Sequence, residues 1–183
     1  MLKSPIRYFS FITFTALYSL ITPNIVHAQQ PIPAPDWGGF QFMMGDWIGE
    51  GGGAPGQGTG WFSFTLDLQQ RILIRKNHSD FPAQNNRPAF THDDLMIVYP
   101  EAGKKAKAIY FDNEGHVIQY AIEISDSSKS VVFISEASPP TPRFRLTYTL
   151  MENDRLKIDF DFAPPGKPET FSRYIESYAK RKK

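Results

Sequence analysis

The densest group of potentially reactive side chains lies in the segment YFDNEGHVIQY, residues 110–120. Asp112, Glu114 and His116 place two carboxylates and an imidazole close together, a combination that can carry out general acid–base chemistry. The letters DNEG are equally typical of a four-residue hairpin turn, because Gly115 can adopt the positive φ that such a turn needs. Under this second interpretation the carboxylates make local hydrogen bonds and remain solvated.

The same segment predicts a polar wall if it forms a hairpin. His116 and Tyr120 are an even number of residues apart and therefore share one face of a strand, while Tyr110 belongs to the preceding strand. If that face lines a cavity, His116 is the candidate acid–base, with Asp112 or Tyr110 beside it. This enzyme hypothesis requires an enclosed histidine next to a space of substrate size.

Two further segments, RKNHSD (75–80) and THDD (91–94), bring together potential metal ligands. His78, Asp80, His92 and Asp94 would lie near strand ends, and two histidines with two carboxylates can bind a divalent cation. Their spacing matches no helical His-x-x-x-His or similar motif. Exposed polar residues at strand ends are the simpler interpretation, and we predict no metal site.

Arginines alternate with threonines in one strand, and charges of both signs alternate in the next. Arg143 and Arg145 share a strand face, as do Asp159 and Asp161. This pattern favours cross-strand ion pairs on a solvent-facing side. The alternative is that an inward-facing Arg75 or Arg145 anchors a ligand carboxylate. No Gly-x-Ser-x-Gly segment is present, so no esterase nucleophile elbow is predicted.

A glycine-rich stretch, GDWIGEGGGAPGQGTGW (45–61), contains a match to Gly-x-Gly-x-x-Gly at Gly51, Gly53 and Gly56. A dinucleotide-binding loop must follow a buried strand and open a helix. Here Pro55 interrupts the match and a strand pattern begins at Trp61. We therefore exclude nucleotide binding and interpret the glycines as part of a strand and a flexible hairpin.

The elements that must position these residues are almost all strands. One short helix is predicted in PDWGGFQFMMG, with Asp36 as its cap and Gly45 as its stop. Period-two patterns and turn residues then predict about ten strands, at 47–51, 61–68, 71–78, 95–99, 106–112, 116–124, 131–135, 143–151, 156–162 and 170–178. The apolar run LMIVY (95–99) predicts a strand covered on both faces.

Short connections without crossover helices favour antiparallel up-and-down pairing. Closing such a sheet removes its two exposed edges, so we predict an all-β antiparallel up-and-down barrel of about ten strands, with a two-sheet sandwich as the alternative. A barrel of this size is wide enough to enclose a cavity. In the first strand, Gly45, Trp47, Gly49 and Gly51 share a face, which leaves open space around the indole.

The segments MMGDWIGEGGG, HDDLMIVY and AIYFDNEGHVIQY resemble the calycin, or lipocalin-like, β-barrels. The similarity is closest to the nitrobindin-like and DUF1579-type bacterial proteins, the latter of unassigned function. The resemblance spans most of the chain and implies a ten-stranded barrel. For a nitrobindin it also implies haem bound by a histidine late in the chain. No histidine follows His116, so we predict no haem and no other cofactor.

The function expected of such a barrel is binding of a small hydrophobic or amphipathic molecule, mainly apolar, in the internal cavity. The polar candidates would orient the ligand, and Trp47 would pack at the closed end. An enzyme using His116 in the same cavity is one alternative, and a structural envelope protein with a filled barrel is another. The predicted ligand-binding residues are Trp47, Trp61, Arg75, Tyr110, His116, Tyr120 and Arg145.

The N-terminal segment predicts export. Lys3 and Arg7 precede an apolar run shorter than the roughly 20 residues of a membrane span, and Val26-His27-Ala28 resembles a signal-peptidase site. We predict a signal peptide at 1–28, a linker at 29–36, a single barrel domain at 37–183, and a periplasmic or secreted protein with no stable membrane span. Oligomeric state is left open.

Charge and cysteine content exclude several classes of function. Without Lys3 and Arg7, the predicted mature chain has 18 basic and 19 acidic residues, so it has no basic field for nucleic acid. The chain contains no cysteine, so disulfides, thiolate metal sites and cysteine nucleophiles are excluded.

Overall fold

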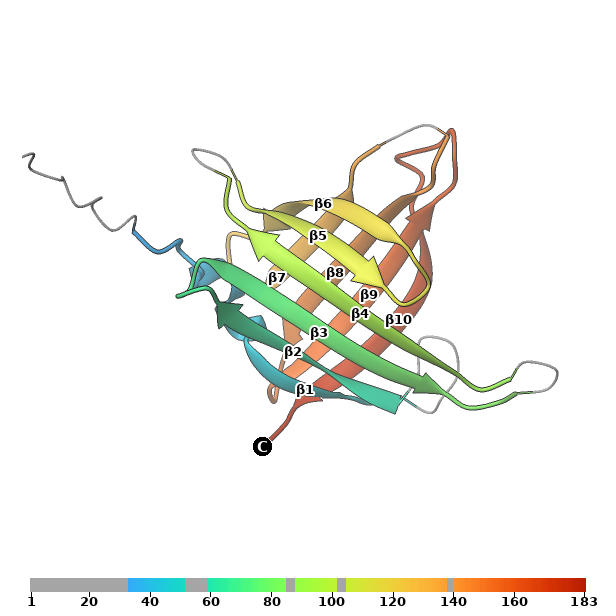
Figure 1. Cartoon of the computed structure of the whole chain (residues 1–183), viewed down its shortest axis with the longest axis horizontal. Helices are drawn as coiled ribbons and strands as arrows, with labels where there is room; N and C mark the ends of the chain where they lie inside the picture. The colour runs from blue at the N-terminus through green and yellow to red at the C-terminus, as the bar shows by residue number, and fades with distance from the viewer. Residues whose placement is uncertain (1–32, 52–58, 85–87, 102–104, 138–139) are drawn as a thin grey trace, which may run out of the picture. The chain divides into compact units, whose positions relative to one another are not determined.

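The computed structural model describes residues 33–51, 59–84, 88–101, 105–137 and 140–183, and in these residues Pro33–Lys183 form one compact unit. Ten antiparallel strands pair in chain order, and β1 also pairs with β10, so that the sheet closes (Figure 1). The predicted all-β, up-and-down barrel of about ten strands is confirmed. Its strands are β1 (Gly45–Gly49), β2 (Thr59–Asp67), β3 (Ile72–Phe81), β4 (Phe90–Tyr99), β5 (Lys107–Asp112), β6 (Val117–Ile124), β7 (Ser130–Ser135), β8 (Arg143–Met151), β9 (Arg155–Ala163) and β10 (Ser172–Arg181).

Several predictions fall on residues outside those described. The signal peptide at 1–28, residues 29–32 of the linker and residues 52–58 of the glycine-rich hairpin belong to this group. The predicted short helix is present as the 3-10 helix η1 (Gly38–Met43), and the Asp36 carboxylate accepts a hydrogen bond from the backbone of Gly38 at 2.8 Å. In the part of the chain that the structure describes, no helix has the length and apolar character to cross a bilayer.

Strand β4 shows how the sequence divides the barrel into an inner and an outer surface. His92, Asp94, Met96 and Val98 occupy one face and are buried or half-buried, because alternate residues of a strand point to opposite sides. Both Met96 and Val98 have no exposed surface. The polar members of this alternation therefore lie inside the barrel, together with apolar ones.

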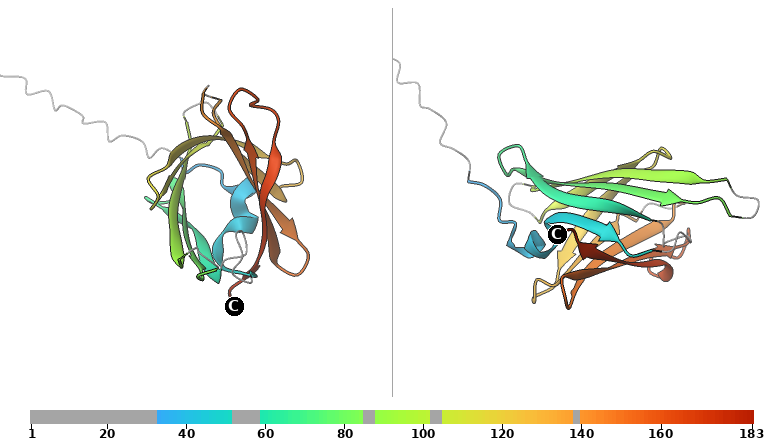
Figure 2. Two further views of the ribbon diagram at one scale, coloured as in Figure 1. Left: turned by 90° about the vertical axis from the view of Figure 1, so that its right-hand side faces the viewer. Right: turned by 90° about the horizontal axis from the view of Figure 1, so that it is seen from below.

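One end of the barrel is closed by η1. The view along the barrel in Figure 2 shows η1 lying across its far end. Phe40, Met43 and Trp47 are buried there, and the Trp47 indole N–H donates to the Met43 carbonyl at 2.8 Å. Arg181 lies over the Trp47 ring at 4.3 Å and donates to the carbonyl oxygens of Met44 and Phe42. These contacts hold η1 in the position where it closes this end of the barrel.

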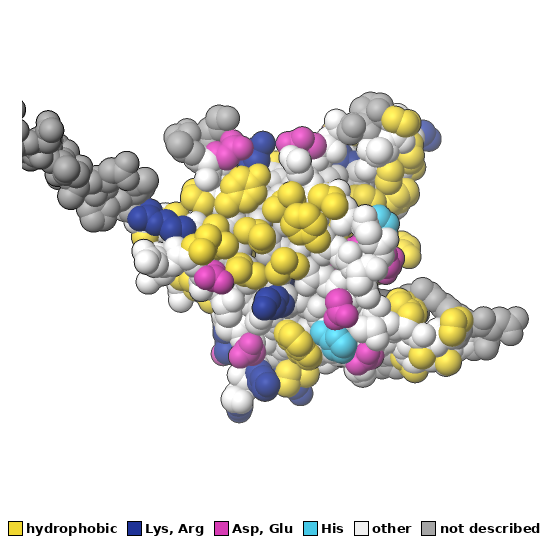
Figure 3. All heavy atoms as spheres, viewed as in Figure 1, with side chains coloured by type: hydrophobic (Ala, Val, Ile, Leu, Met, Phe, Trp, Pro, Cys, Tyr) yellow, Lys and Arg dark blue, Asp and Glu magenta, His cyan; other side chains and the backbone are white. Residues whose placement is uncertain are grey.

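The outer face of β4 corrects one prediction. Leu95 and Ile97 point outward, where they pair with Phe111 and Ile109 of β5, and they are only half-buried. Among the described residues, β4 contacts its sheet neighbours β3 and β5, and its outward side chains stay half-buried, so the LMIVY strand is buried on its inner face alone. Figure 3 shows hydrophobic side chains gathered on this outer surface. The run LMIVY is continuously apolar because the outer surface of the barrel is itself apolar here. No second layer of structure is needed to explain it.

Candidate functional site

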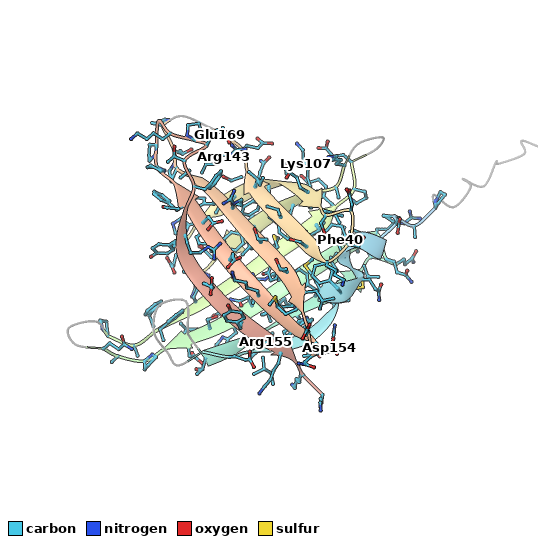
Figure 4. All side chains as sticks on the ribbon, turned by 180° about the vertical axis from the view of Figure 1, so that it is seen from behind. Phe40, Lys107, Arg143, Asp154, Arg155 and Glu169 are labelled. Carbon is cyan, nitrogen blue, oxygen red and sulfur yellow. The ribbon has the colours of Figure 1, made fainter. Side chains whose placement is uncertain are left out.

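The half of the barrel opposite η1 contains a cavity of about 1290 Å³. Its mouth lies at the ends of the hairpins β3–β4, β5–β6 and β7–β8, which contribute Phe81, Phe90, His116 and Pro142 to the lining. In Figure 4, the labelled Arg143 and Glu169 lie at the mouth end of the β8–β10 wall, and Asp154 and Arg155 lie at the closed end. The barrel is therefore filled at one end and hollow at the other.

One wall of the cavity is apolar. Phe144 of β8 and Phe160 of β9 stack with ring centroids 5.6 Å apart, and Phe162 lies 6.1 Å from Phe144. These residues face inward because β8 and β9 alternate apolar and polar residues in register, with Phe144 opposite Phe162 and Leu146 opposite Phe160. Further apolar lining residues of this wall include Leu146, Ile158, Ile175 and Ala179.

The opposite wall is polar and belongs to β3, β4, β5 and the β5–β6 hairpin. At its base, the Arg75 guanidinium forms an ion pair with the Asp94 carboxylate, and both side chains are buried. Burial is the largest single effect on the pKa of Arg75 and lowers it, but the Asp94 charge, together with the surrounding tyrosines, raises the pKa above its usual value. Arg75 also lies 5.6 Å from the centre of the Phe62 ring and 6.0 Å from that of Tyr148, which places the cation on an aromatic floor.

His92 connects this ion pair to the mouth. Its Nε2 lies 3.4 Å from an Asp94 oxygen and 3.2 Å from the Tyr110 hydroxyl, while its Nδ1 lies 3.0 Å from a Glu114 oxygen. The Asp94 carboxylate is the main cause that raises the pKa of His92 to about 9, and Glu114 adds to it against the opposing effect of burial. His92 is therefore an imidazolium cation at neutral pH.

Two tyrosines complete the polar wall. Tyr110 and Tyr120 pack edge to face, with ring centroids 6.4 Å apart. Burial is the main cause that raises the pKa of both hydroxyls, so they are neutral hydrogen-bonding groups. For Tyr110, the raising effect of the Asp94 charge exceeds the lowering effect of Arg75.

Asp112 and His116 form the turn that was predicted as a hairpin. The Asp112 carboxylate accepts hydrogen bonds from the backbone N–H groups of Glu114 and His116 and lies 2.8 Å from Nδ1 of His116. Partial burial would raise the pKa of Asp112, but these bonds lower it. The His116 side chain is 60% exposed at the mouth. It does not occupy the enclosed position that the enzyme hypothesis requires.

The structure places the predicted ligand-binding residues in different surroundings. Arg75, Tyr110, Tyr120 and His116 border the cavity. Trp47 lies in the closed end, fully buried, and stacks against Phe62.

Trp61 and Arg145 differ in their surroundings from the other predicted ligand-binding residues. Trp61 lines the cavity at its mouth, where the residue is 48% exposed and its ring stacks on His78 with centroids 6.0 Å apart. Arg145 lies between two cavity residues, Phe144 and Leu146, and therefore points outward. It bonds Asp161 at 2.9 Å and packs over the Phe171 ring, and it is not among the residues that line the cavity. The outer cross-strand ion pair favoured by the charge pattern is present between Arg145 and Asp161.

The four potential metal ligands lie on two sides of the sheet. His92 and Asp94 point into the cavity, whereas His78 bonds Asp80 and Asp93 on the outer surface. Within the described ranges, no group of three or more histidine and carboxylate side chains has metal-binding geometry. The interpretation of His92 and Asp94 as exposed strand-end residues is also corrected, because β4 begins at Phe90 and Asp94 is buried.

The sequence alone did not identify His92, Asp94 and Glu114 as neighbours that line the cavity together. A signal was present, because His92 and Asp94 continue the same alternation as the buried Met96 and Val98. The predicted strand began at Leu95, whereas β4 begins at Phe90, so His92 and Asp94 fell outside the predicted alternation. The aromatic residues of the apolar wall, Phe144 and Phe160, were likewise not among the predicted ligand-binding residues.

Comparison of the chain with protein-family models and with curated proteins finds no match. The structure itself, a closed barrel of ten antiparallel strands, is consistent with a calycin, or lipocalin-like, fold.

Proposed function

We propose that this protein binds a small, mainly apolar amphipathic molecule inside the open half of the barrel. The observation that carries this proposal is the cavity of about 1290 Å³ with its two contrasting walls. A volume of this order accommodates a ligand of lipid or drug size. The ligand would lay its apolar body against Phe144 and Phe160 and direct its polar end toward His92, Tyr110 and Tyr120.

The division of the cavity supports an amphipathic ligand over a purely apolar one. The apolar wall lowers the free energy of a hydrocarbon chain by removing it from water, at about 25 cal/mol per Å² of buried surface. The polar wall has a different role. Its hydrogen-bonding side chains lose their water when a ligand enters, and this costs free energy unless the ligand provides new hydrogen-bond partners. A ligand with a polar end supplies such partners.

The two alternatives receive less support. The structural hypothesis assumed a filled barrel, and its premise is not met by the hollow half. The enzyme hypothesis assumed an enclosed His116, and that side chain lies exposed on a turn.

The test is fluorescence titration of the purified protein with the uncharged probe N-phenyl-1-naphthylamine, which brightens in apolar surroundings. We expect saturable binding by the unmodified protein and strong loss of binding in Phe160→Lys. The lysine places a charge in the centre of the apolar wall, where Phe160 stacks on Phe144. The desolvation cost of that charge reduces binding by an expected factor of ten or more, since about 1.4 kcal/mol corresponds to tenfold.

The matched control is Thr147→Lys. Thr147 lies on β8 opposite Asp159 of β9, on the outer surface of the same wall. It adds the same charge without entering the cavity, so probe binding should remain near that of the unmodified protein. Absence of probe binding by the unmodified protein, or equal loss in both variants, would contradict the proposal.

A further inference from the structure

We infer that the polar end of the ligand is cationic or uncharged and is not a carboxylate. This inference rests on the proposed function and specifies the ligand class of the same cavity. It follows from how the charges of the polar wall are already paired. A buried arginine alone would indicate a site for a carboxylate, and the surroundings of Arg75 remove that possibility.

Arg75 is the cation at the base of the wall, and it is already neutralised. Its guanidinium forms an ion pair with Asp94, and both side chains are buried. The Nε of Arg75 makes no hydrogen bond in the described part of the chain, but this atom is itself buried. It therefore offers no exposed donor to a ligand oxygen. A ligand carboxylate placed against Arg75 would lie beside the Asp94 carboxylate, whose charge repels it.

His92 is the second cation, and two carboxylates already neutralise it. Its ring nitrogens lie 3.4 Å from Asp94 and 3.0 Å from Glu114. The carboxylate of Asp112 adds a third negative charge to the wall, bonded to the turn of His116. Three carboxylates thus face two buried or half-buried cations, and His116 contributes only at the exposed rim. The three carboxylates and two cations of the wall therefore leave an excess of one negative charge.

The field of these charges acts on the groups that a ligand would meet. The Asp112 carboxylate lies 3.3 Å from the Tyr110 hydroxyl oxygen, and the carboxylates of Asp94 and Glu114 flank His92. The net negative charge of these groups attracts a positive head group and repels a negative one. Tyr120 lines the same region and can donate or accept a hydrogen bond with an uncharged hydroxyl or carbonyl group. Geometry and charge therefore favour an amine, an alcohol or a ketone.

The experiment compares three ligands that differ only in head group: decylamine, decanol and decanoate. Each displaces N-phenyl-1-naphthylamine from the purified protein at pH 7, below the critical micelle concentration of each compound. We expect decylamine to bind at least as tightly as decanol and decanoate to bind at least tenfold more weakly than decanol. Decanoate binding that equals or exceeds decanol binding would overturn the inference while leaving the proposed function intact. If the probe itself does not bind, the proposed function fails and the inference fails with it.

Variant Glu114→Gln tests whether the polar wall causes the preference. It removes one carboxylate beside His92 at the mouth, and should weaken decylamine relative to decanol by roughly fivefold while strengthening decanoate by a similar factor. The control is Asp93→Asn, which removes the same charge on the neighbouring outer face, where Asp93 pairs with His78. It should leave the ligand order and ratios nearly unchanged. Equal shifts in both variants would show that net protein charge sets the preference, which would contradict the assignment to this wall.

Discussion

The pairing of His92 with Asp94 and Glu114 predicts that folding stability falls as the pH rises above neutrality. The folded pKa of His92 is raised from 6.5 to about 9. A raised pKa means that the folded state binds the proton more tightly than the unfolded state does. The corresponding stability is therefore fully present below pH 6.5 and is lost as the pH rises through 9.

The magnitude follows from the size of that pKa change. At 1.36 kcal/mol for each pKa unit, a rise from 6.5 to about 9 corresponds to about 3 kcal/mol. The His92 side chain is 25% exposed, so solvent screening makes this an upper value. A loss of about 3 kcal/mol is a large part of the stability of a typical domain.

The assay is urea unfolding at a series of pH values between 6 and 9.5, comparing the unmodified protein with His92→Gln. Glutamine retains a hydrogen-bond donor toward Asp94 but cannot titrate. The difference in unfolding free energy between the two proteins should shrink by about 2 to 3 kcal/mol across this range. His78→Gln removes a histidine with a raised pKa from the outer face and should leave the His92 contribution intact. Parallel pH profiles for the unmodified protein and His92→Gln would refute the reasoning.

Two further stability changes follow from the same structure. Asp94→Leu leaves the buried Arg75 guanidinium without its carboxylate and should destabilise the fold by about 3 to 5 kcal/mol in urea unfolding, whereas the double variant with Arg75→Met should recover most of that loss. Gly60→Ala should destabilise by about 2 kcal/mol or more in the same assay, because its Cβ would lie 2.0 Å from the His78 carbonyl oxygen, where β2 and β3 approach closely. Gly115→Ala, whose Cβ meets no atom within 4 Å but whose φ is +92°, should cost only about 1 kcal/mol.

Each of these changes has a contradicting outcome. A double variant no more stable than Asp94→Leu would show that the buried ion pair does not explain the loss. A Gly60→Ala protein as stable as Gly115→Ala would show that the close approach of the two strands is not needed for closure of the barrel.

Much of the fold was predictable because it follows from local patterns. Period-two alternation in segments such as 156–162, with turn residues between strands, predicted the number and direction of the strands. The connections are too short for crossover helices, which leaves antiparallel pairing and favours closure. The first strand, around Trp47, was correctly placed to within two residues at each end.

The site was less predictable, since it depends on which strand face turns inward. Arg75 and Arg145 look alike in the sequence, but the first lies inside the barrel and the second outside. Neighbouring cavity residues Phe144 and Leu146 fix the outward direction of Arg145, and this becomes clear only once the inner wall is known. Asp94 was similarly hidden, because its partner Arg75 belongs to another strand and the start of β4 was misplaced.

The most direct test of the account is native mass spectrometry of the protein purified from the organism that encodes it, compared with Phe160→Lys prepared in the same way. The account predicts that the unmodified protein carries a bound small molecule, amphipathic and without a carboxylate, and that Phe160→Lys lacks it. An adduct of the same mass on both proteins, or no adduct on either, would contradict binding in the barrel cavity.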